Sequence, residues 1–254
     1  MDSTDLNQEQ NQEIDSFNKI FRVQKLSFET DKYPSLEARK ESLNTLKKMI
    51  IDNQDLIIDA INQDFKNRAR QESITFEILP TILTINYTLK HLKKWMAPQK
   101  RPVHLLFQPG SATVYYQPLG VVGVIVPWNY PLFLAMGPLI QALAAGNKVM
   151  IKMSEFTPHF SLLLKSLIAQ YFDQNQISII VGDAIVASEF THLPFDHLLY
   201  TGSTHIGKKV MAAAANNLTP VTLELGGKSP VIVCSDSNIQ DAAEKIAYGK
   251  QVNA

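Results

Sequence analysis

The stretch that most constrains the fold is the apolar run Val121–Val126, which lies between Gly120 and Pro127. A short run of Val, Ile and Gly with no polar member predicts a strand that is buried on both faces. Pro127 has no backbone N–H and should end the hydrogen-bond ladder. Because ligands bind beyond the carboxyl ends of strands in open α/β sheets, Trp128 and Asn129 are expected to border a functional site.

Short apolar runs and helical segments alternate from this point onward. The expected strands are residues 121–126, 148–151, 177–181, 197–200 and 221–225. Strands that alternate with helices of this length form βαβ units, which are joined by right-handed crossovers in a parallel sheet. The sequence therefore predicts an α/β fold with a doubly wound, Rossmann-like parallel sheet in residues 119–225.

The preceding part of the chain is predicted to be a polar tail followed by helices. Residues 1–15 are rich in Gln, Asn and Asp, and are expected to be disordered. Residues 16–97 carry apolar side chains at helical spacing, with Ser35 as an expected N-cap and a break between helices at Asp52-Asn53. Pro80 is expected to kink the last of these helices.

A hairpin is predicted within residues 98–118. Two β-prone runs, 103–107 and 112–117, are separated by Pro109-Gly110, which is a strong turn signal. Such a hairpin is either an ordinary sheet edge or an arm that pairs with another subunit, and its sequence leaves both possibilities open.

Charge and cysteine content exclude several classes of protein. Lys and Arg together number 24, as do Asp and Glu, so no basic face for nucleic acid is indicated. The lone Cys234 excludes an intrachain disulfide and a cysteine-based zinc site, and no metal site is predicted. The amino terminus does not resemble a signal peptide, and no apolar run approaches the length of a membrane span. A cytoplasmic protein without a membrane segment is expected.

Two groups of residues that follow expected strands suit a dinucleotide. Gly202, Ser203 and Gly207 lie between a strand and a helix, where a Gly-rich turn can bring a pyrophosphate to the helix N-terminus. The spacing is not G-x-G-x-x-G, so an ordinary capped turn is an equal alternative. Lys152 and Glu155 offer a donor and an acceptor for ribose hydroxyls, and the carboxylate favours NAD over NADP. The alternative for this pair is a solvent-exposed Lys/Glu pair on a loop.

Glu224 stands out because it lies between apolar neighbours in the expected strand 221–225. A carboxylate at the end of a mostly buried strand tends to have a raised pKa, which suits a general base at neutral pH. A buried glutamate with a structural partner is the alternative. Asn129 is similarly either an oxyanion donor or a turn residue beside Pro131.

Four motifs in this order closely resemble those of the aldehyde dehydrogenase superfamily. They are PWNYP at 127–131, KMSEFTP at 152–158, YTGSTHIG at 200–207 and LELGGKSP at 223–230. The likeness extends from about Phe21 to the last residue. Residues 101–139 are especially similar to coniferyl aldehyde dehydrogenases of the class 3 branch.

The resemblance implies a role for each candidate residue. Asn129 matches the oxyanion-hole amide, and Glu224 matches the general base. The implied cofactor is NAD, with NADP possible, and its binding residues would be Trp128, Lys152, Glu155, Gly202, Ser203, Gly207 and Gly226. Met153 replaces a usual proline and is expected to loosen the loop that aims Glu155.

The resemblance also implies that the family's nucleophilic cysteine is absent from this sequence. The family's nucleophilic cysteine lies in a segment similar to NAGQxC, whereas this sequence stops at Val252-Asn253-Ala254. Cys234 is expected to be an inert buried thiol rather than a substitute. Residues 226–254 would then be the truncated start of a second α/β catalytic domain.

The expected activity is NAD(P)-dependent oxidation of an aldehyde, aromatic or similar to coniferyl aldehyde, to the carboxylic acid through a cysteine thiohemiacetal. The chain itself is expected to be an amino-terminal part that is inactive alone. The alternatives are a standalone nucleotide-binding or assembly module and a misfolded remnant. The intact enzyme is expected to be a homodimer or larger, with residues 98–118 as its arm.

Overall fold

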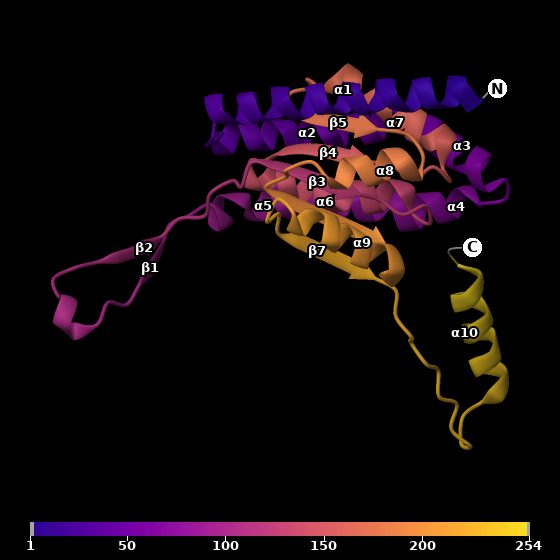
Figure 1. Ribbon diagram of the computed structural model, residues 1–254. Coiled ribbons are helices and arrows are strands. Elements are labelled where there is room, and N and C mark those ends of the chain that lie inside the picture. The colour runs from indigo at the N-terminus through magenta and orange to yellow at the C-terminus, as the bar shows by residue number, and fades with distance from the viewer. Residues whose placement is uncertain (1–2, 253–254) are drawn as a thin grey trace.

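The computed structural model describes residues 3–252, and a five-stranded parallel sheet lies at its centre (Figure 1). The strands are β3 (Val121–Ile125), β4 (Lys148–Lys152), β5 (Ile177–Ile180), β6 (His197–Gly202) and β7 (Val221–Leu225). Their order across the sheet is β5-β4-β3-β6-β7. The predicted doubly wound α/β fold is confirmed, and the direction of winding reverses between β3 and β6.

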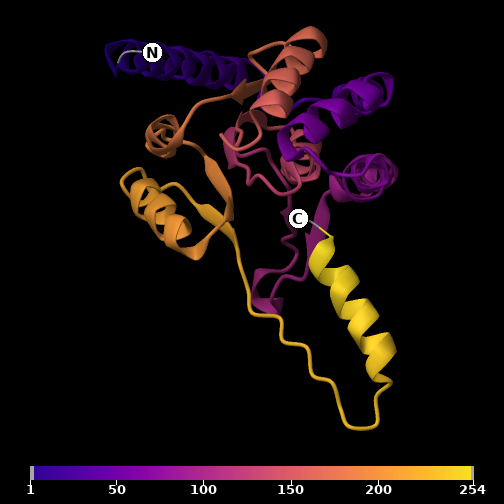
Figure 2. The ribbon, with the colours of Figure 1, turned by 90° about the vertical axis from the view of Figure 1, so that its right-hand side faces the viewer.

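Helices cover both faces of this sheet (Figure 2). One face carries α6 (Pro131–Ala145) and α7 (Pro158–Tyr171), and outside them lie α2 (Leu36–Asp52), α3 (Gln54–Phe65) and α5 (Leu79–Trp95). The opposite face carries α1 (Ser3–Thr30), α8 (Ala184–Thr191) and α9 (Thr204–Ala215). Alternate residues of β3 supply the two cores: Val122 and Val124 face α6, whereas Val121 and Ile125 face the opposite group.

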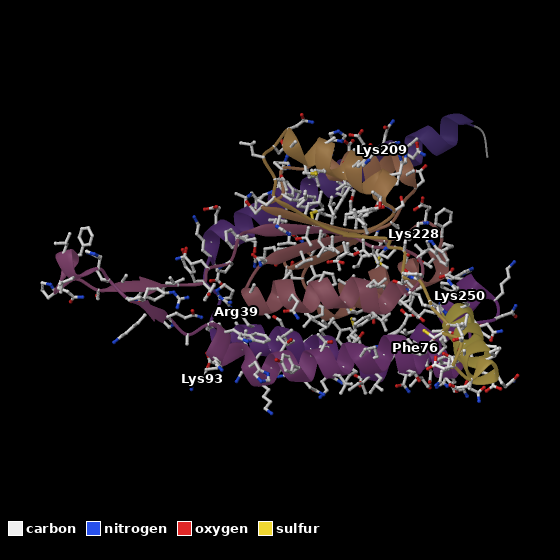
Figure 3. The ribbon with its side chains drawn as sticks, turned by 90° about the horizontal axis from the view of Figure 1, so that it is seen from below. Arg39, Phe76, Lys93, Lys209, Lys228 and Lys250 are labelled. Carbon is white, nitrogen blue, oxygen red and sulfur yellow. The ribbon has the colours of Figure 1, made fainter. Side chains whose placement is uncertain are left out.

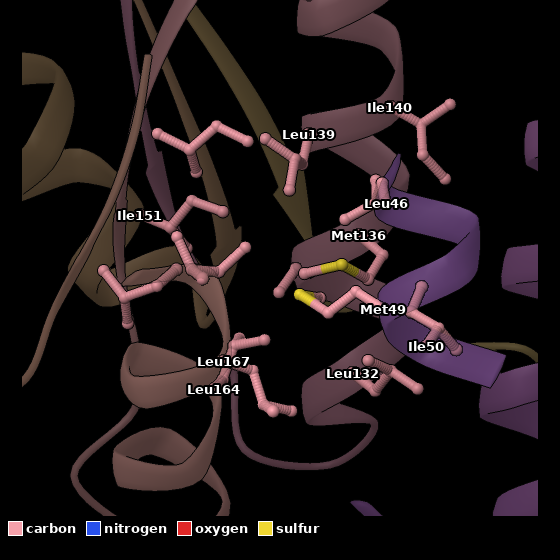
Figure 4. Packing of buried hydrophobic residues seen from close by; sticks show 14 of the residues in the cluster. Leu46, Met49, Ile50, Leu132, Met136, Leu139, Ile140, Ile151, Leu164 and Leu167 are labelled. Atoms are coloured by element: carbon pink, nitrogen blue, oxygen red, sulfur yellow. The ribbon is translucent and has the colours of Figure 1, made fainter. Parts of the chain in front are cut away.

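The larger core is built where α6 lies between the sheet and α2. Figure 4 shows Ile151 of β4 on one side, Met136 and Leu139 of α6 in the middle, and Met49 of α2 beyond them. All four side chains are completely buried. Side chains that fill such a layer without gaps fix α6, and therefore the loop that leads into it, relative to the sheet.

Several helix boundaries confirm the sequence predictions. The Ser35 hydroxyl accepts a hydrogen bond from the Ala38 amide at 3.1 Å, and α2 ends at Asp52 before α3 begins at Gln54. The kink expected at Pro80 takes another form. A π-helical turn, η1 (Ile74–Ile78), joins α4 (Arg70–Ser73) to α5, and Pro80 lies in the first turn of α5.

The expectation that residues 1–15 are disordered is wrong from Ser3 onward, because α1 begins there; residues 1 and 2 lie outside the described part. Contacts with distant segments hold this helix. Gln10 donates to the Asp183 carboxylate at 2.6 Å, and Glu13 forms an ion pair with Lys165 at 3.1 Å. Local composition could not reveal partners that lie about 150 residues away or more.

The predicted hairpin is present, but its first strand lies earlier than expected. β1 (Gln99–Arg101) pairs in antiparallel fashion with β2 (Ala112–Val114), and the hairpin extends away from the body of the molecule (Figure 1). The run 103–107 is not a strand, and its last three residues form a short 3₁₀ helix, η2 (Leu105–Phe107). Pro102 has no N–H to donate, so the ladder stops at Arg101.

The segment after β7 leads away from the sheet to α10 (Ile239–Gln251) (Figures 1 and 2). No residue of α10 is buried, and Ile232 is 83% exposed. Cys234 is exposed, so the expectation of a buried thiol is wrong. The strand-like run around it has no neighbouring strand within the described chain to bury it. No helix in residues 3–252 is both long and apolar enough to cross a membrane.

Gly123→Ala is expected to destabilise the centre of the sheet. An added Cβ would lie 2.7 Å from the Phe195 ring and 2.8 Å from the Leu198 side chain, both of which are buried. Overpacking of this kind costs about 1–3 kcal/mol, which urea denaturation would detect as a lower midpoint. Gly137→Ala in α6, where an added Cβ meets nothing within 4 Å, should instead raise stability by about 0.5–1 kcal/mol. Equal losses in both variants would contradict this packing.

Candidate functional site

The sheet places two candidate segments beside each other at the reversal of its strand order. β3 and β6 are neighbours, and their register pairs Ile125 with Tyr200. The Trp128-Asn129 segment follows the first strand, whereas Gly202 ends the second strand and Ser203 follows it. Crevices at such reversals are the usual ligand sites of doubly wound sheets.

Trp128 and Asn129 form a bend between β3 and α6. Trp128 is exposed, and its ring centroid lies 6.0 Å from that of Phe65. Asn129 is half-buried, and its side chain makes no hydrogen bond to any residue that the structure describes. Its amide is therefore available to a ligand at the carboxyl end of the sheet.

The turn after β6 begins α9 with a capped N-terminus. The Ser203 hydroxyl accepts a hydrogen bond from the Ile206 amide at 3.3 Å, as expected for an N-cap. A Cβ at Gly202 would lie 2.3 Å from the Tyr200 hydroxyl oxygen, and one at Gly207 would lie 2.8 Å from Leu225. Gly207 thus permits tight packing of α9 against the sheet, and Gly202 leaves room for the Tyr200 hydroxyl. The first amides of the 12-residue helix lie at the carboxyl edge.

Lys152 is 1% exposed at the end of β4, so it is not half of a solvent-exposed pair. Its ammonium donates to the backbone oxygens of Met153 and Gly182, each at 2.7 Å. Burial lowers the pKa of Lys152 to about 8, although the carboxylates of Glu155 and Asp183 act in the opposite direction. An ammonium has three N–H donors, so one remains for a ligand. Glu155 is exposed in the following turn.

Met153 does not loosen this loop in the way that was expected. Its backbone N–H donates to the Ile180 oxygen at 3.0 Å, which extends the pairing of β4 with β5. Its side chain is buried in the larger core. A proline could not donate this hydrogen bond, so methionine anchors the chain just before Glu155.

Glu224 is exposed, so the expectation of a mostly buried carboxylate is wrong. β7 is the edge strand of the sheet, and no further strand of residues 3–252 covers it. The register pairs Glu224 with Thr201, on the face of the sheet that carries α6. Asn129 precedes α6, the helix that covers the same face.

Gly226 follows β7 and is exposed. A Cβ at this position would meet no atom within 4 Å, so packing inside the described chain does not require glycine here. Its expected role beside a cofactor stays a prediction.

Sequence reasoning missed Glu77, which lies in η1 and is 0% exposed. One carboxylate oxygen accepts hydrogen bonds from the amides of Leu132 at 2.6 Å and Phe133 at 3.3 Å, in the first turn of α6. The other oxygen accepts a hydrogen bond from Arg68 at 3.2 Å. Glu77 lies three residues after Ile74, on the apolar stripe of its helix, and this position could have indicated a buried acid.

Burial raises the pKa of Glu77 to about 7, because the loss of hydration outweighs the stabilising effect of the Leu132 amide and of Arg68. Arg68 is equally buried, and its guanidinium carbon lies 3.7 Å from the Phe65 ring centroid. A buried ion pair therefore lies directly beneath the loop that carries Asn129.

Comparisons with known proteins identify the family of this chain. The family model "Aldehyde dehydrogenase family" matches residues 6–254. A probable coniferyl aldehyde dehydrogenase of Pseudomonas aeruginosa is 52% identical over 247 residues, which cover 97% of this chain and 52% of that protein.

Two solved structures share the fold. Staphylococcus aureus AldH in a substrate-bound state has a TM-score of 0.89 at 39% identity, covering 94% of this chain and 52% of that chain. A Mycobacterium tuberculosis aldehyde dehydrogenase complexed with NAD+ has a TM-score of 0.77 at 28% identity, covering 87% of this chain and 46% of that chain. The chain thus spans about half the length of the relatives it matches. Because the family model covers almost every residue of the sequence, the chain belongs to the aldehyde dehydrogenase family.

Proposed function

We propose that this chain provides the cofactor-binding half of an NAD(P)-dependent aldehyde dehydrogenase, together with its oxyanion donor and its general base. The proposed substrate is an aromatic aldehyde similar to coniferyl aldehyde, by analogy with the Pseudomonas aeruginosa relative. The observation that carries the proposal is the adjacency of the Trp128-Asn129 and Gly202-Ser203 segments at the reversal of the sheet, in a chain of this family.

The side chains at the carboxyl edge of the sheet suit a dinucleotide. The free N–H of Lys152 and the exposed carboxylate of Glu155 would hold the ribose hydroxyls, and the amides that follow Ser203 would face the pyrophosphate. Trp128 would line the cleft, and the backbone at Gly226 would pass beside the nicotinamide. When bound, the cofactor takes up a hydride from the carbon that is oxidised. Glu155 would repel a 2′-phosphate, which favours NAD.

The catalytic roles follow from the chemistry of each group. Asn129 would donate a hydrogen bond to the aldehyde oxygen, which gains negative charge as a thiolate attacks the carbon. Glu224 would remove the proton from the thiol and later from the hydrolytic water. We propose that the attacking thiol is not Cys234, because that residue lies on the exposed segment that leads away from the sheet.

We also propose how this chain fits into a larger enzyme. The apolar side chains of Leu105–Phe107 at the hairpin tip are exposed, which supports an arm that pairs subunits of a homodimer or larger assembly. Residues 226–252 would begin the catalytic domain of a cytoplasmic enzyme. The alternatives remain a nucleotide-binding module, which would bind NAD without any partner chain, and a misfolded remnant, which would aggregate and bind none.

NAD affinity is expected to depend on the charge of Lys152. Loss of a charge-assisted hydrogen bond in Lys152→Met should weaken binding by about 10- to 100-fold in a titration followed by Trp128 fluorescence. Because the pKa of Lys152 is about 8, affinity should also fall as the pH rises from 7 to 10, and this fall should be absent in the variant. Lys93→Met, an exposed site on α5, is the control. Unchanged binding by Lys152→Met would contradict the proposed site.

A further inference from the structure

We propose that Arg68 and Glu77 are positioning residues that fix the Trp128–Tyr130 segment from beneath, through the first turn of α6. Their importance for catalysis rests on the proposed function of Asn129, but the positioning itself can be measured without any ligand. Arg68 and Glu77 belong to the end of the molecule where the carboxyl ends of the strands lie. Figure 3 shows Phe76, the neighbour of Glu77, and Lys228, which follows β7, at the end opposite the hairpin arm.

Glu77 holds the start of α6. The first amides of a helix have no partner inside the helix, and a carboxylate that accepts from them is also favoured by the helix dipole. Glu77 accepts from the amides of Leu132 and Phe133, which begin three residues after Asn129. The π-helical turn η1 carries Glu77 at a fully buried position. The bend at Asn129 is thereby tied to a second helical segment.

Arg68 holds the side chains on either side of Asn129. Its guanidinium carbon lies 3.7 Å from the Phe65 ring centroid and 5.0 Å from that of Tyr130. Phe65 in turn packs against Trp128, with ring centroids 6.0 Å apart. The residues before and after Asn129 therefore both rest on one cluster, whose charge comes from Arg68.

Burying Arg68 and Glu77 costs free energy, which argues against a purely stabilising role for the pair. Among the described residues, Arg68 Nε and Nη2 find no hydrogen-bond partner, and Nε lies 3.8 Å from the nearest Glu72 oxygen. An apolar pair of similar volume would fill such a space at no loss, and often with a gain, in stability. An apolar pair could not bind the amides of α6, however. The groups that face Glu77 are Arg68 and the two amides, and Glu72 and Tyr130 also lie close to Arg68.

Two measurements on Glu77→Gln test the proposal. In a Trp95→Phe background, Trp128 is the only tryptophan, since the chain has two. Its emission should titrate near pH 7 in the parent, where burial places the pKa of Glu77, and should not titrate in Glu77→Gln. Amide hydrogen exchange in residues 128–134 should become about tenfold faster, while β4 and α7 keep the parent rate.

Glu72→Gln is the matched control, because Glu72 also approaches Arg68 but its side chain is partly exposed. It should leave the titration and the exchange unchanged. A Glu77→Gln protein that titrates as the parent does, or that protects residues 128–134 equally well, would overturn the proposal.

The double variant Arg68→Met/Glu77→Met distinguishes two roles of the pair: holding the Trp128–Tyr130 segment in place, and only filling space in the core. It should match the parent in thermal stability and still exchange rapidly at residues 128–134. A stable double variant with full protection there would show that the pair only fills space, and the proposal would fail. Neither measurement uses NAD or an aldehyde, so a failure of NAD to bind would count against the proposed function alone.

Discussion

The purified 254-residue chain is expected to oxidise no coniferyl aldehyde when it is supplied with NAD. In the proposed mechanism, oxidation requires a thiolate at the place where Asn129 would donate to the aldehyde oxygen. The only thiol of the sequence belongs to Cys234, which lies on an exposed segment beyond the edge of the sheet. NADH formation, followed by absorbance, should therefore not exceed the rate without protein. Turnover that Cys234→Ser abolishes would contradict the assignment of roles.

A complementation experiment tests the same assignment of roles through a gain of activity. Co-expression with the second half of the Pseudomonas aeruginosa relative should restore turnover if the two parts assemble. In such a complex, loss of one oxyanion donor in Asn129→Ala should lower kcat by about 10²–10³-fold. Cys234→Ser should leave kcat unchanged. A complex that is active but indifferent to Asn129→Ala would show that the amide belongs to an ordinary turn.

Local sequence predicted those parts of the fold whose causes are local. Residues 121–125 of the apolar run became a strand buried on both faces because neighbours flank it on each side. Ser35 became an N-cap because its hydroxyl needs only the amide three residues later.

The errors at α1, Glu224 and Glu77 arose where distant parts of the chain decide the outcome. α1 forms at Gln10 and Glu13 because residues more than 150 positions away bind them. The exposure of Glu224 depends on its position at the edge of the sheet, which the alternation of residues inside one strand does not reveal. The pairing of Glu77 with α6 depends on how two helical segments pack, so the residue beneath the candidate site was not found.

Arg68→Met is expected to be the most damaging substitution in the amino-terminal helices. It removes one partner of a pair in which both side chains are completely buried. Breaking such a pair costs about 3–5 kcal/mol where the remaining charge stays ionised. Arg70→Met, two residues away at an exposed ion pair with Asp55, should cost much less stability and serves as the control.

The loss of folding stability in Arg68→Met should also depend on pH. The direction of this dependence follows from the raised pKa of Glu77. An acid whose pKa is higher in the folded state than in the unfolded state contributes stability at low pH, which is lost as the pH rises through the folded value. Below about pH 7 Glu77 holds its proton in both parent and variant, so the two differ least there. Above pH 7 the Glu77 carboxylate of the parent ionises beside Arg68. In the variant Glu77 has no such partner, so it ionises only at a higher pH. Each further pH unit should then widen the difference by about 1.4 kcal/mol until the variant also ionises. Urea denaturation at pH 6 and pH 9 measures this, and an equal penalty at both would mean that Arg68 does not stabilise the Glu77 carboxylate.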